Sequence, residues 1–290
     1  IPNELFQGGV VLNYKVAGDE NTVSVSRFSA KGANCSADVN LELVFKTLQL
    51  SGLAEIPYFV LPNGNSVSTD IYFDPLDKGF MAFAPQLFLG QKSLTALQLT
   101  LLPHNDSYDF AFEAYDYSNT DNGEPGLIKF DGSYLTDSKY VQTSVSLNSL
   151  FVSSLVEFGS QMVPAEQINT LNTVAGAADG FMLSGDAYVS TDLKSLSYNV
   201  PYILVANTKK DNQVLMLSAN GNEQELNLDQ LNFVYGKYAF GATAAVNFNK
   251  ESKDIFFTTD MVFENVPYHF NGTVMNNLIS VSGDYNTLVD

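Results

Sequence analysis

The stretch ANCSADVNLELVF, residues 33–45, alternates apolar and polar side chains almost without interruption. The apolar set is Ala33, Cys35, Ala37, Val39, Leu41, Leu43 and Phe45, and only Val44 interrupts the polar set between them. Because successive side chains of a β-strand point to opposite faces, this pattern predicts a strand with one apolar and one polar face. Such strands are typical of antiparallel sheets.

The same alternation recurs along the chain, most clearly in residues 238–248, 97–101 and 10–16. Segments rich in Gly, Asn, Asp and Pro separate the alternating runs and suit hairpin turns. These segments are residues 18–21, 62–65, 122–126, 209–212 and 220–222. Together the runs and turns predict an all-β chain of roughly fifteen strands, arranged mostly as a meander.

One region has helical instead of alternating spacing. Residues 147–159 place Leu150, Leu155 and Phe158 at that spacing, and Gly159 suits a helix end. A second helix is expected from Pro164 to a stop near residues 176–180, since proline suits the first turn. We therefore expect one or two short helices near residues 147–176, which plug an open end or face of the sheet.

Three prolines share a local motif: Pro57, Pro201 and Pro267 lie in EIPY, NVPY and NVPY. Proline lacks the N–H that a sheet ladder uses, so it is tolerated at strand starts, edges and bulges. The motif indicates a recurring strand unit in which proline marks a kink or an entry into the sheet. The alternative is coincidence in a chain rich in Val and Tyr.

The composition excludes several classes of function. The net charge of −18 leaves no basic stripe for nucleic acid. The chain has one cysteine and two histidines, His104 and His269, too few for a structural zinc site. Nucleophile, phosphate-binding and dinucleotide-binding motifs are missing. We therefore predict a protein that is not an enzyme, with no catalytic residue, metal or cofactor.

The acidic segment from Asp106 to Glu124 raises calcium binding as an alternative, because carboxylates are calcium ligands. However, Asp109 and Glu113 alternate with aromatic residues, which predicts that they form a solvent-facing strand face and do not converge on an ion.

The chain starts at Ile1 and lacks a signal peptide, and we interpret it as a piece of a longer protein. We expect a single elongated β domain over residues 1–290, with possible sub-units 1–146 and 181–290 joined by a helical segment, 147–180.

Residues 163–200, together with YHFNGTVMNNLISVSGDYN at residues 268–286, resemble the AsmA-like and TamB families of bacterial envelope proteins. The resembling features are a helix, a Gly-punctuated apolar stretch and short strand units in which Gly272 and Gly283 end alternations. The resemblance covers about a quarter of the chain, and the families' N-terminal anchor and C-terminal domain are not recognisable.

The resemblance implies a long antiparallel sheet curled into a half-open, taco-like trough with an apolar inside. It also implies a periplasmic location, an inner-membrane tether outside this chain, and movement of phospholipids between the inner and outer membranes. The expected partners are phospholipid acyl chains, with outer-membrane assembly proteins as further candidates. The predicted groove lining is Leu41, Leu43, Phe45, Leu97, Leu99, Leu101, Tyr238, Phe240, Val246, Phe248, Phe257, Met261, Phe263, Tyr268 and Phe270.

Two readings of these residues stay open. In one, they line an open groove for lipid. In the other, the same side chains fill the closed core of a β-sandwich. The sandwich reading leads to a cell-surface binding or adhesion module that presents tyrosines on its loops, such as Tyr115, Tyr117 and Tyr134.

Overall fold

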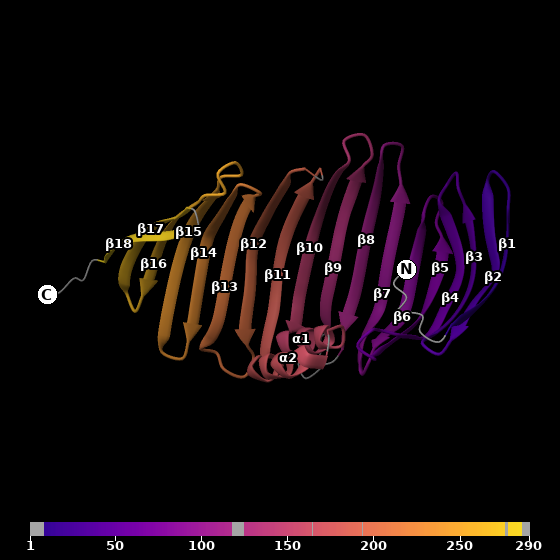
Figure 1. Ribbon diagram of the computed structural model, residues 1–290, viewed down its shortest axis with the longest axis horizontal. Helices are drawn as coiled ribbons and strands as arrows, with labels where there is room; N and C mark the ends of the chain where they lie inside the picture. The colour runs from indigo at the N-terminus through magenta and orange to yellow at the C-terminus, as the bar shows by residue number, and fades with distance from the viewer. Residues whose placement is uncertain (1–8, 118–124, 164, 193, 276–277, 286–290) are drawn as a thin grey trace. The chain divides into compact units, whose positions relative to one another are not determined.

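The computed structural model describes residues 9–117, 125–163, 165–192, 194–275 and 278–285. These residues form eighteen antiparallel strands that belong to one sheet, which is not closed on itself, and two helices lie between β10 and β11 in the chain (Figure 1). The prediction of an all-β chain with a many-stranded antiparallel sheet and two short helices is therefore confirmed.

The chain divides into two compact units. The first comprises Ile1–Thr136 with Ser149–Asp179, and the second comprises Asp137–Asn148 with Gly180–Asp290. Both helices thus belong to the first unit, and β10 (Tyr140–Phe151) contributes residues to each. The expected organisation as one domain, with sub-units around segment 147–180, stays a prediction.

The first unit is built from consecutive hairpins, in which each strand from β1 to β9 pairs with the next. Its strands are β1 (Val10–Gly18), β2 (Thr22–Gly32), β3 (Cys35–Val44), β4 (Gln49–Val60), β5 (Ser66–Pro75), β6 (Phe80–Leu89), β7 (Lys92–Pro103), β8 (Ser107–Asp116) and β9 (Gly126–Leu135). Its helices are α1 (Val152–Ser160) and α2 (Ala165–Ala177).

The second unit repeats this plan from β11 to β18. Its strands are β11 (Phe181–Thr191), β12 (Leu196–Asn207), β13 (Gln213–Asn222), β14 (Glu225–Tyr235), β15 (Tyr238–Phe248), β16 (Ile255–Phe263), β17 (Val266–Met275) and β18 (Leu278–Tyr285). The quoted stretch at residues 33–45 is β3, and residues 238–248 are β15, as their alternation predicts.

Turn chemistry explains most of the hairpin ends. Asp19 follows β1, and its carboxylate accepts the N–H groups of Asn21 and Thr22 at 2.8 and 2.9 Å. In the β16–β17 turn, Glu264 and Asn265 both have positive φ, the backbone that two-residue hairpin turns require. The predicted turns at residues 18–21, 62–65 and 209–212 are confirmed, and most of the one at 122–126 lies outside the described residues.

Three expectations were wrong in detail. Eighteen strands replace the expected fifteen or so. Residues 147–151 belong to strand β10, so the first helix starts only at Val152. Residues 220–222 end β13, and the turn follows them. The helical spacing failed because Leu150 and Phe151 are buried as strand residues, and burial in a sheet overrides a short-range pattern.

Two of the three motif prolines lie where the ladder is irregular and the third lies near a strand start, in line with the kink or strand entry that the motif predicts. Pro57 lies between Ile56 and Tyr58, where the register of β4 shifts against both neighbours. Pro201 lies at the matching shifts of β12. Pro267 is the second residue of β17 and pairs with Val262 of β16 in a regular register. Pro57 and Pro201 thus avoid a regular ladder position, because the missing N–H leaves no bond there, and Pro267 lies where its strand enters the sheet.

Candidate functional site

In the first unit, the strand registers align apolar side chains of neighbouring strands on one face. Side chains of directly paired residues lie on the same face of an antiparallel sheet. Leu41 of β3 pairs with Val25 of β2 and with Gly52 of β4. The large apolar side chains of this face include Val25, Phe28, Val39, Leu41, Leu43, Phe59, Ile71, Phe73, Phe80, Leu94, Leu97, Leu99, Leu101, Phe110, Phe112, Ile128 and Phe130.

Bulges keep these side chains on the same face along each strand. Val25 and Phe28 are three residues apart, yet they pair with Leu41 and Val39, which are two apart. The extra residue of the β2 bulge lets Phe28 point to the same face as Val25, although the two are three residues apart. The same device operates at Pro57 of β4. A bulged strand also bends, so the shifts curve each unit locally.

The second unit carries a matching apolar face from β11 to β18. Phe240 of β15 pairs with Phe233 of β14 and Phe263 of β16. Across the next strand pair, Met261 is opposite Tyr268. The large side chains of this face include Leu183, Ile203, Val205, Leu215, Leu217, Leu226, Leu228, Leu231, Phe233, Phe240, Val246, Phe248, Phe257, Met261, Phe263, Tyr268 and Phe270.

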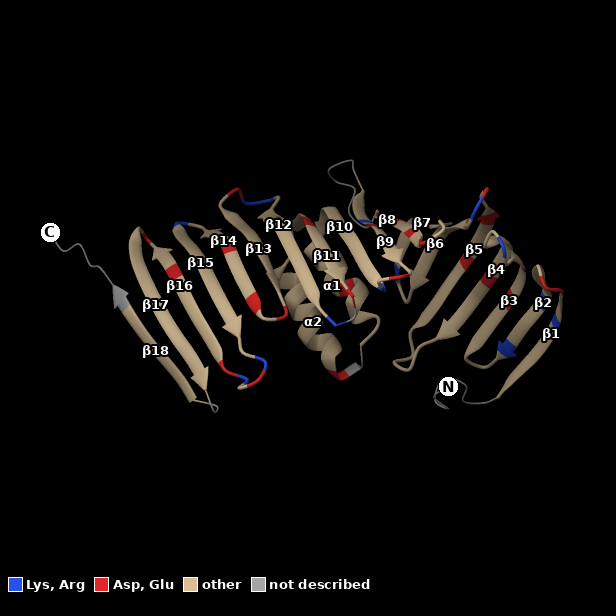
Figure 2. Cartoon of the chain, turned by 90° about the horizontal axis from the view of Figure 1, so that it is seen from above, with Lys and Arg blue, Asp and Glu red and all other residues tan. Residues whose placement is uncertain are grey.

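Charge is excluded from the apolar face of the second unit. Among the paired residues of β11–β18, the positions on this face include no Asp, Glu, Lys or Arg. The carboxylates of these strands, such as Asp186 and Asp260, occupy the opposite face. Figure 2 shows acidic residues on strands such as β14 and β16 and others at the turns. Each unit is therefore amphipathic across the thickness of a single sheet.

The fifteen predicted lining residues lie on strands or at a strand end, and none of them is buried. In the second unit the structure brings nine of them together on the adjacent strands β15, β16 and β17. In the first unit, the three leucines of β7 are adjacent, whereas Leu41 and Leu43 lie on β3. Phe45 follows the end of β3 and is 46% exposed.

Burial elsewhere in the described residues is small. The buried apolar residues are mainly alanines, together with Cys35, Leu89, Leu150 and Phe151. Large apolar side chains remain exposed on both units, including Leu99 at 40% and Tyr238 at 50%. The closed core that the sandwich reading requires is therefore not seen within either unit.

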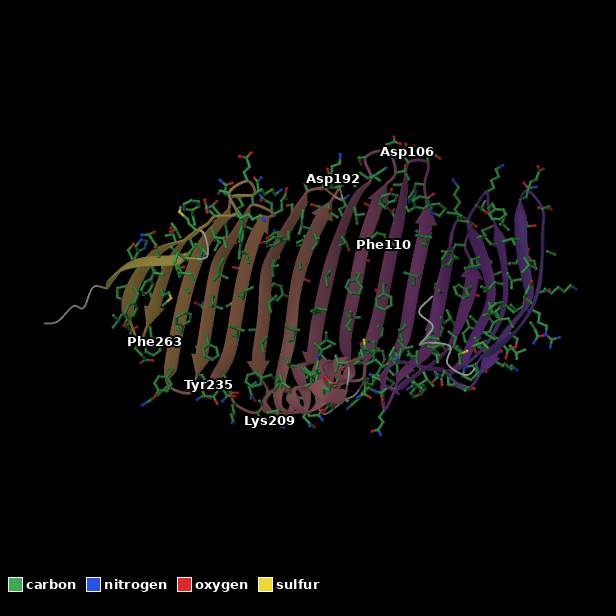
Figure 3. The ribbon with its side chains drawn as sticks, in the orientation of Figure 1. Asp106, Phe110, Asp192, Lys209, Tyr235 and Phe263 are labelled. Carbon is green, nitrogen blue, oxygen red and sulfur yellow. The ribbon has the colours of Figure 1, made fainter. Side chains whose placement is uncertain are left out.

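Reasoning from the sequence missed several residues of the same faces. Phe28, Phe59 and Phe73 of the first unit belong to the apolar face but follow or flank bulges, where simple alternation fails. Phe110 (Figure 3) and Phe112 of β8 also belong to this face, and their clear alternation in the sequence was a signal that could have identified them. Phe112 stacks on Phe130 of β9 with ring centroids 5.6 Å apart.

Glycines opposite aromatic residues are a feature of the second unit. Gly272 pairs with Phe257, and Gly283 pairs with Phe270. A Cβ on Gly272 would lie 2.1 Å from the Phe257 ring, so the ring lies over the glycine. Both glycines lie inside strands β17 and β18, which corrects the expectation that they end alternations. They let aromatic rings lie flat on the apolar face.

Helix α1 covers part of the sheet in the first unit and encloses a hollow of about 400 Å³. The lining includes Leu94 and Ile128 of the apolar face, and Leu155 and Phe158 of α1. The rest of the lining is mostly polar and consists of Gln86, Gln91, Lys92, Ser93, Thr95, the buried Asp116, Tyr117 and Ser154. Helix α1 thus lies against a face of the sheet, one of the two locations expected for a plugging helix.

Side chains of the β4–β5 turn and of strand β7 hold α1 in place. Asn63 and Asn65 of the β4–β5 turn donate hydrogen bonds to the carbonyl of Gln161 at 2.5 and 2.9 Å. Lys92 forms an ion pair with Glu157 of α1. The free carbonyls at the helix C-terminus thereby gain partners, which fixes the helix end against the sheet.

The polar faces carry ion pairs and hydrogen bonds of ordinary surface type. His104 lies 2.8 Å from Asp109, and His269 bonds to Asp260 at 2.6 Å, all four groups being substantially exposed. Hydrogen bonds that the Lys129 ammonium donates to Glu113 and then to Asp131 raise the pKa of Lys129. Within the described ranges, no group of three or more His, Cys, Asp or Glu side chains is placed to hold a metal ion.

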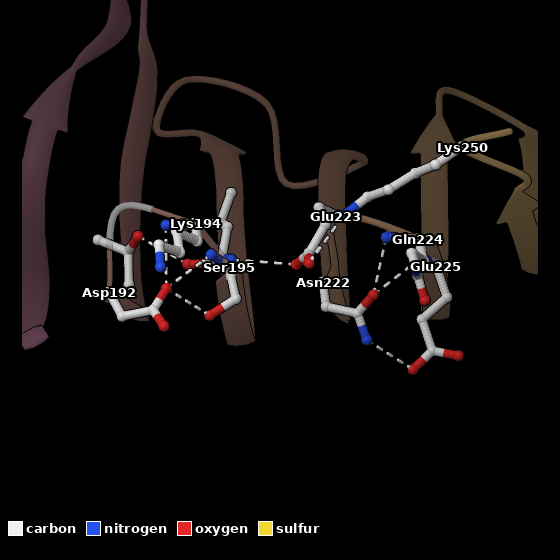
Figure 4. A network of polar contacts seen from close by, with 10 residues as sticks. Asp192, Lys194, Ser195, Asn222, Glu223, Gln224, Glu225 and Lys250 are labelled. Atoms are coloured by element: carbon white, nitrogen blue, oxygen red, sulfur yellow. Dashed lines mark hydrogen bonds and ion pairs between the residues drawn. The ribbon is translucent and has the colours of Figure 1, made fainter. Parts of the chain in front are cut away.

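A network of carboxylates ties three turns of the second unit together (Figure 4). Glu223 accepts the backbone N–H of Leu196 and pairs with Lys250, both at 3.0 Å. Asp192 accepts bonds from Ser195 and Lys194 at 2.7–2.9 Å. Bonds from Leu196 to Glu223 and from Ser195 to Asp192 are the main causes that lower each pKa to about 2. The network has a structural role, because its carboxylates accept hydrogen bonds from backbone N–H groups in and beside the turns.

The tyrosines expected on loops lie mostly on strands. Tyr115 is in β8 and Tyr134 in β9, where it stacks on Tyr108 at 6.4 Å. Tyr117 follows β8 and is 52% exposed.

No helix among the described residues combines the length and the apolar character needed to cross a membrane.

No protein-family model matches the chain, and no curated protein or solved structure was found to be similar to it. The resemblance to AsmA-like and TamB proteins therefore stays a prediction from residues 163–200 and the end of the chain.

Proposed function

We propose that this chain binds lipid without catalysing a reaction, and that its apolar faces hold the acyl chains of phospholipids. The observation that carries the proposal is the charge-free, uncovered apolar face of β11–β18 in the second unit. Exposed apolar patches larger than a few hundred Å² are uncommon on soluble proteins and mark binding surfaces.

The energetics of lipid transfer require a surface of this kind. Exposing hydrocarbon to water costs about 0.8 kcal/mol per methylene, so two chains of about sixteen carbons cost on the order of 25 kcal/mol. A carrier must cover these chains over a broad area and leave the charged headgroup in water. A sheet with one apolar face and one polar face provides both environments.

The wider role follows from the family resemblance and belongs to the same proposal. The chain would act in the periplasm, tethered to the inner membrane by a segment outside this sequence. It would move phospholipids between the inner and outer membranes, with outer-membrane assembly proteins as further partners. The proposed activity uses neither a catalytic group nor a cofactor.

The test uses the chain purified without detergent, extracted with organic solvent and analysed for phospholipid by mass spectrometry. Wild-type protein should release phospholipid. Val246→Asp places a charge on the apolar face, because Val246 pairs with Leu226 and Phe257, and should strongly reduce the lipid released. Asn247→Asp adds the same charge one residue along, on the opposite face, and should leave the lipid content unchanged.

Wild-type protein that is consistently free of lipid would refute the proposal, as would an equal loss of bound lipid in both variants.

A second candidate function is a glycan-binding module. A hollow of about 400 Å³ in the second unit joins Phe256 to Asn247, Thr258 and Asn271, a combination of aromatic ring and polar groups that suits sugars. Glycan-array binding by lipid-free protein would favour this candidate.

A further inference from the structure

The hollow under α1 is the most specific apolar site in the first unit. It differs from the open faces because a helix covers it. Leu155 and Phe158 of α1 lie over Leu94 and Ile128, whose side chains belong to the apolar face by register. A ligand in this hollow therefore meets apolar groups from the helix as well as from the sheet.

The hollow is continuous with the apolar face of the first unit. Leu94 precedes Leu97, Leu99 and Leu101 on the same face of β7, across the irregularity at Ala96. Ile128 is followed on its face by Phe130 of β9. An extended hydrocarbon lying on this face can thus reach Leu94 and Ile128 in the hollow along a row of apolar side chains.

The size and the attachment of α1 limit the occupant. A volume of about 400 Å³ is in the range of small-molecule sites, and Leu94, Leu155 and Phe158 offer apolar contacts to a ligand within it. The Lys92–Glu157 ion pair and the bonds from Asn63 and Asn65 hold the helix over the sheet. The volume and the fixed helix suit a thin, flexible ligand whose apolar part contacts Leu94, Leu155 and Phe158.

We propose that this hollow receives the methyl end of a single acyl chain, which lies on the apolar face of the first unit and ends under α1. The proposal deepens the proposed lipid-binding function and rests on it for the origin of the acyl chain. Helix α1 then acts as an end stop that selects chains by their length.

The first test is a photo-crosslink with the full chain. Palmitate that carries a diazirine at its methyl end is bound, irradiated, and the modified peptides are identified by mass spectrometry. Modification should concentrate on residues 92–95, residue 128 and residues 154–158, which contain the lining residues Leu94, Ile128, Leu155 and Phe158. Modification spread over other strands, or none in these segments, would overturn the proposal.

The second test fills the hollow. Leu155→Trp should weaken palmitate binding about ten-fold or more, the loss expected when about two methylene groups stay in water. Val156→Trp adds the same ring at the next position of α1, which is not among the lining residues, and should leave affinity nearly unchanged. Equal losses in both variants, or none in Leu155→Trp, would contradict the end-stop role. Circular dichroism checks that both variants fold.

These experiments separate the two proposals. If phospholipid is released from the purified protein but palmitate does not label the hollow, the end stop is wrong and lipid binding stands. If palmitate labels the hollow while no phospholipid is found, the hollow is a fatty-acid site and the proposed phospholipid function is wrong.

Discussion

The two units have the same hairpin plan, yet only the first has a helix over its sheet. In the first unit, Leu89, Leu150 and Phe151 are buried. In the second unit, the buried residues other than glycine among those described are Ala219 and the hydrogen-bonded pair Asn207 and Gln213. The second unit therefore depends on its strand ladders and cross-strand pairs, with little side-chain core.

This difference shows that long paired strands can present an apolar face that no other described element of the same unit covers. Three or more paired strands supply enough backbone bonds and cross-strand contacts for stability. The apolar face then remains available for a ligand. In the first unit, part of that face is used for packing α1, and the remainder leads into the hollow.

The largest expected effect is the loss of the small core in the first unit. Leu150 has no exposed surface, and Leu150→Ala should lower the free energy of unfolding by about 2–5 kcal/mol. Leu217→Ala on the half-buried face of the second unit should cost roughly 1 kcal/mol, because less contact is lost. Urea unfolding followed by circular dichroism measures both. Equal costs would remove the contrast between the units.

A smaller effect is expected at a close backbone approach. Gly52 has φ +130°, and a Cβ there would lie 2.0 Å from the carbonyl oxygen of Asn40. Gly52→Ala should therefore destabilise the first unit by about 1–3 kcal/mol. Gly241→Ala in the second unit, where the nearest atom lies at 3.4 Å, should stay within about 0.5 kcal/mol of wild type in the same unfolding measurement. A neutral Gly52→Ala would contradict this register.

The smallest effect concerns the turn network of the second unit. The ordinary pKa of Glu223 is 4.5 and its folded value is about 2, so its contribution to stability is full above pH 4.5 and is lost as the pH falls through about 2. Glu223→Gln should flatten the acid limb of the stability–pH profile slightly, since the group is exposed.

The control for this pH experiment lies in a neighbouring turn. Glu251→Gln removes the same charge from the β15–β16 turn and leaves the bonds of Glu223 to Leu196 and Lys250 intact. Thermal unfolding between neutral pH and about pH 3 should show the flattening only in Glu223→Gln. An identical change in both variants would assign the effect to net charge.

The sequence by itself determined the β class, the turns and the polarity of many strands. Alternation in residues 33–45 and 238–248 places Leu41 and Phe240 on apolar faces, because side-chain direction in a strand is a local property. Pro57 and Pro201 marked irregular strand positions for an equally local reason, the missing N–H.

Tertiary structure alone decided which strands pair, where bulges restore the apolar side, and what covers each face. Phe28 and Phe59 join the apolar face only because β2 and β4 gain an extra residue against β3. Leu150 ends a strand instead of starting a helix because it is buried beside Gly126. These outcomes depend on contacts between distant residues, which a pattern along one segment does not contain.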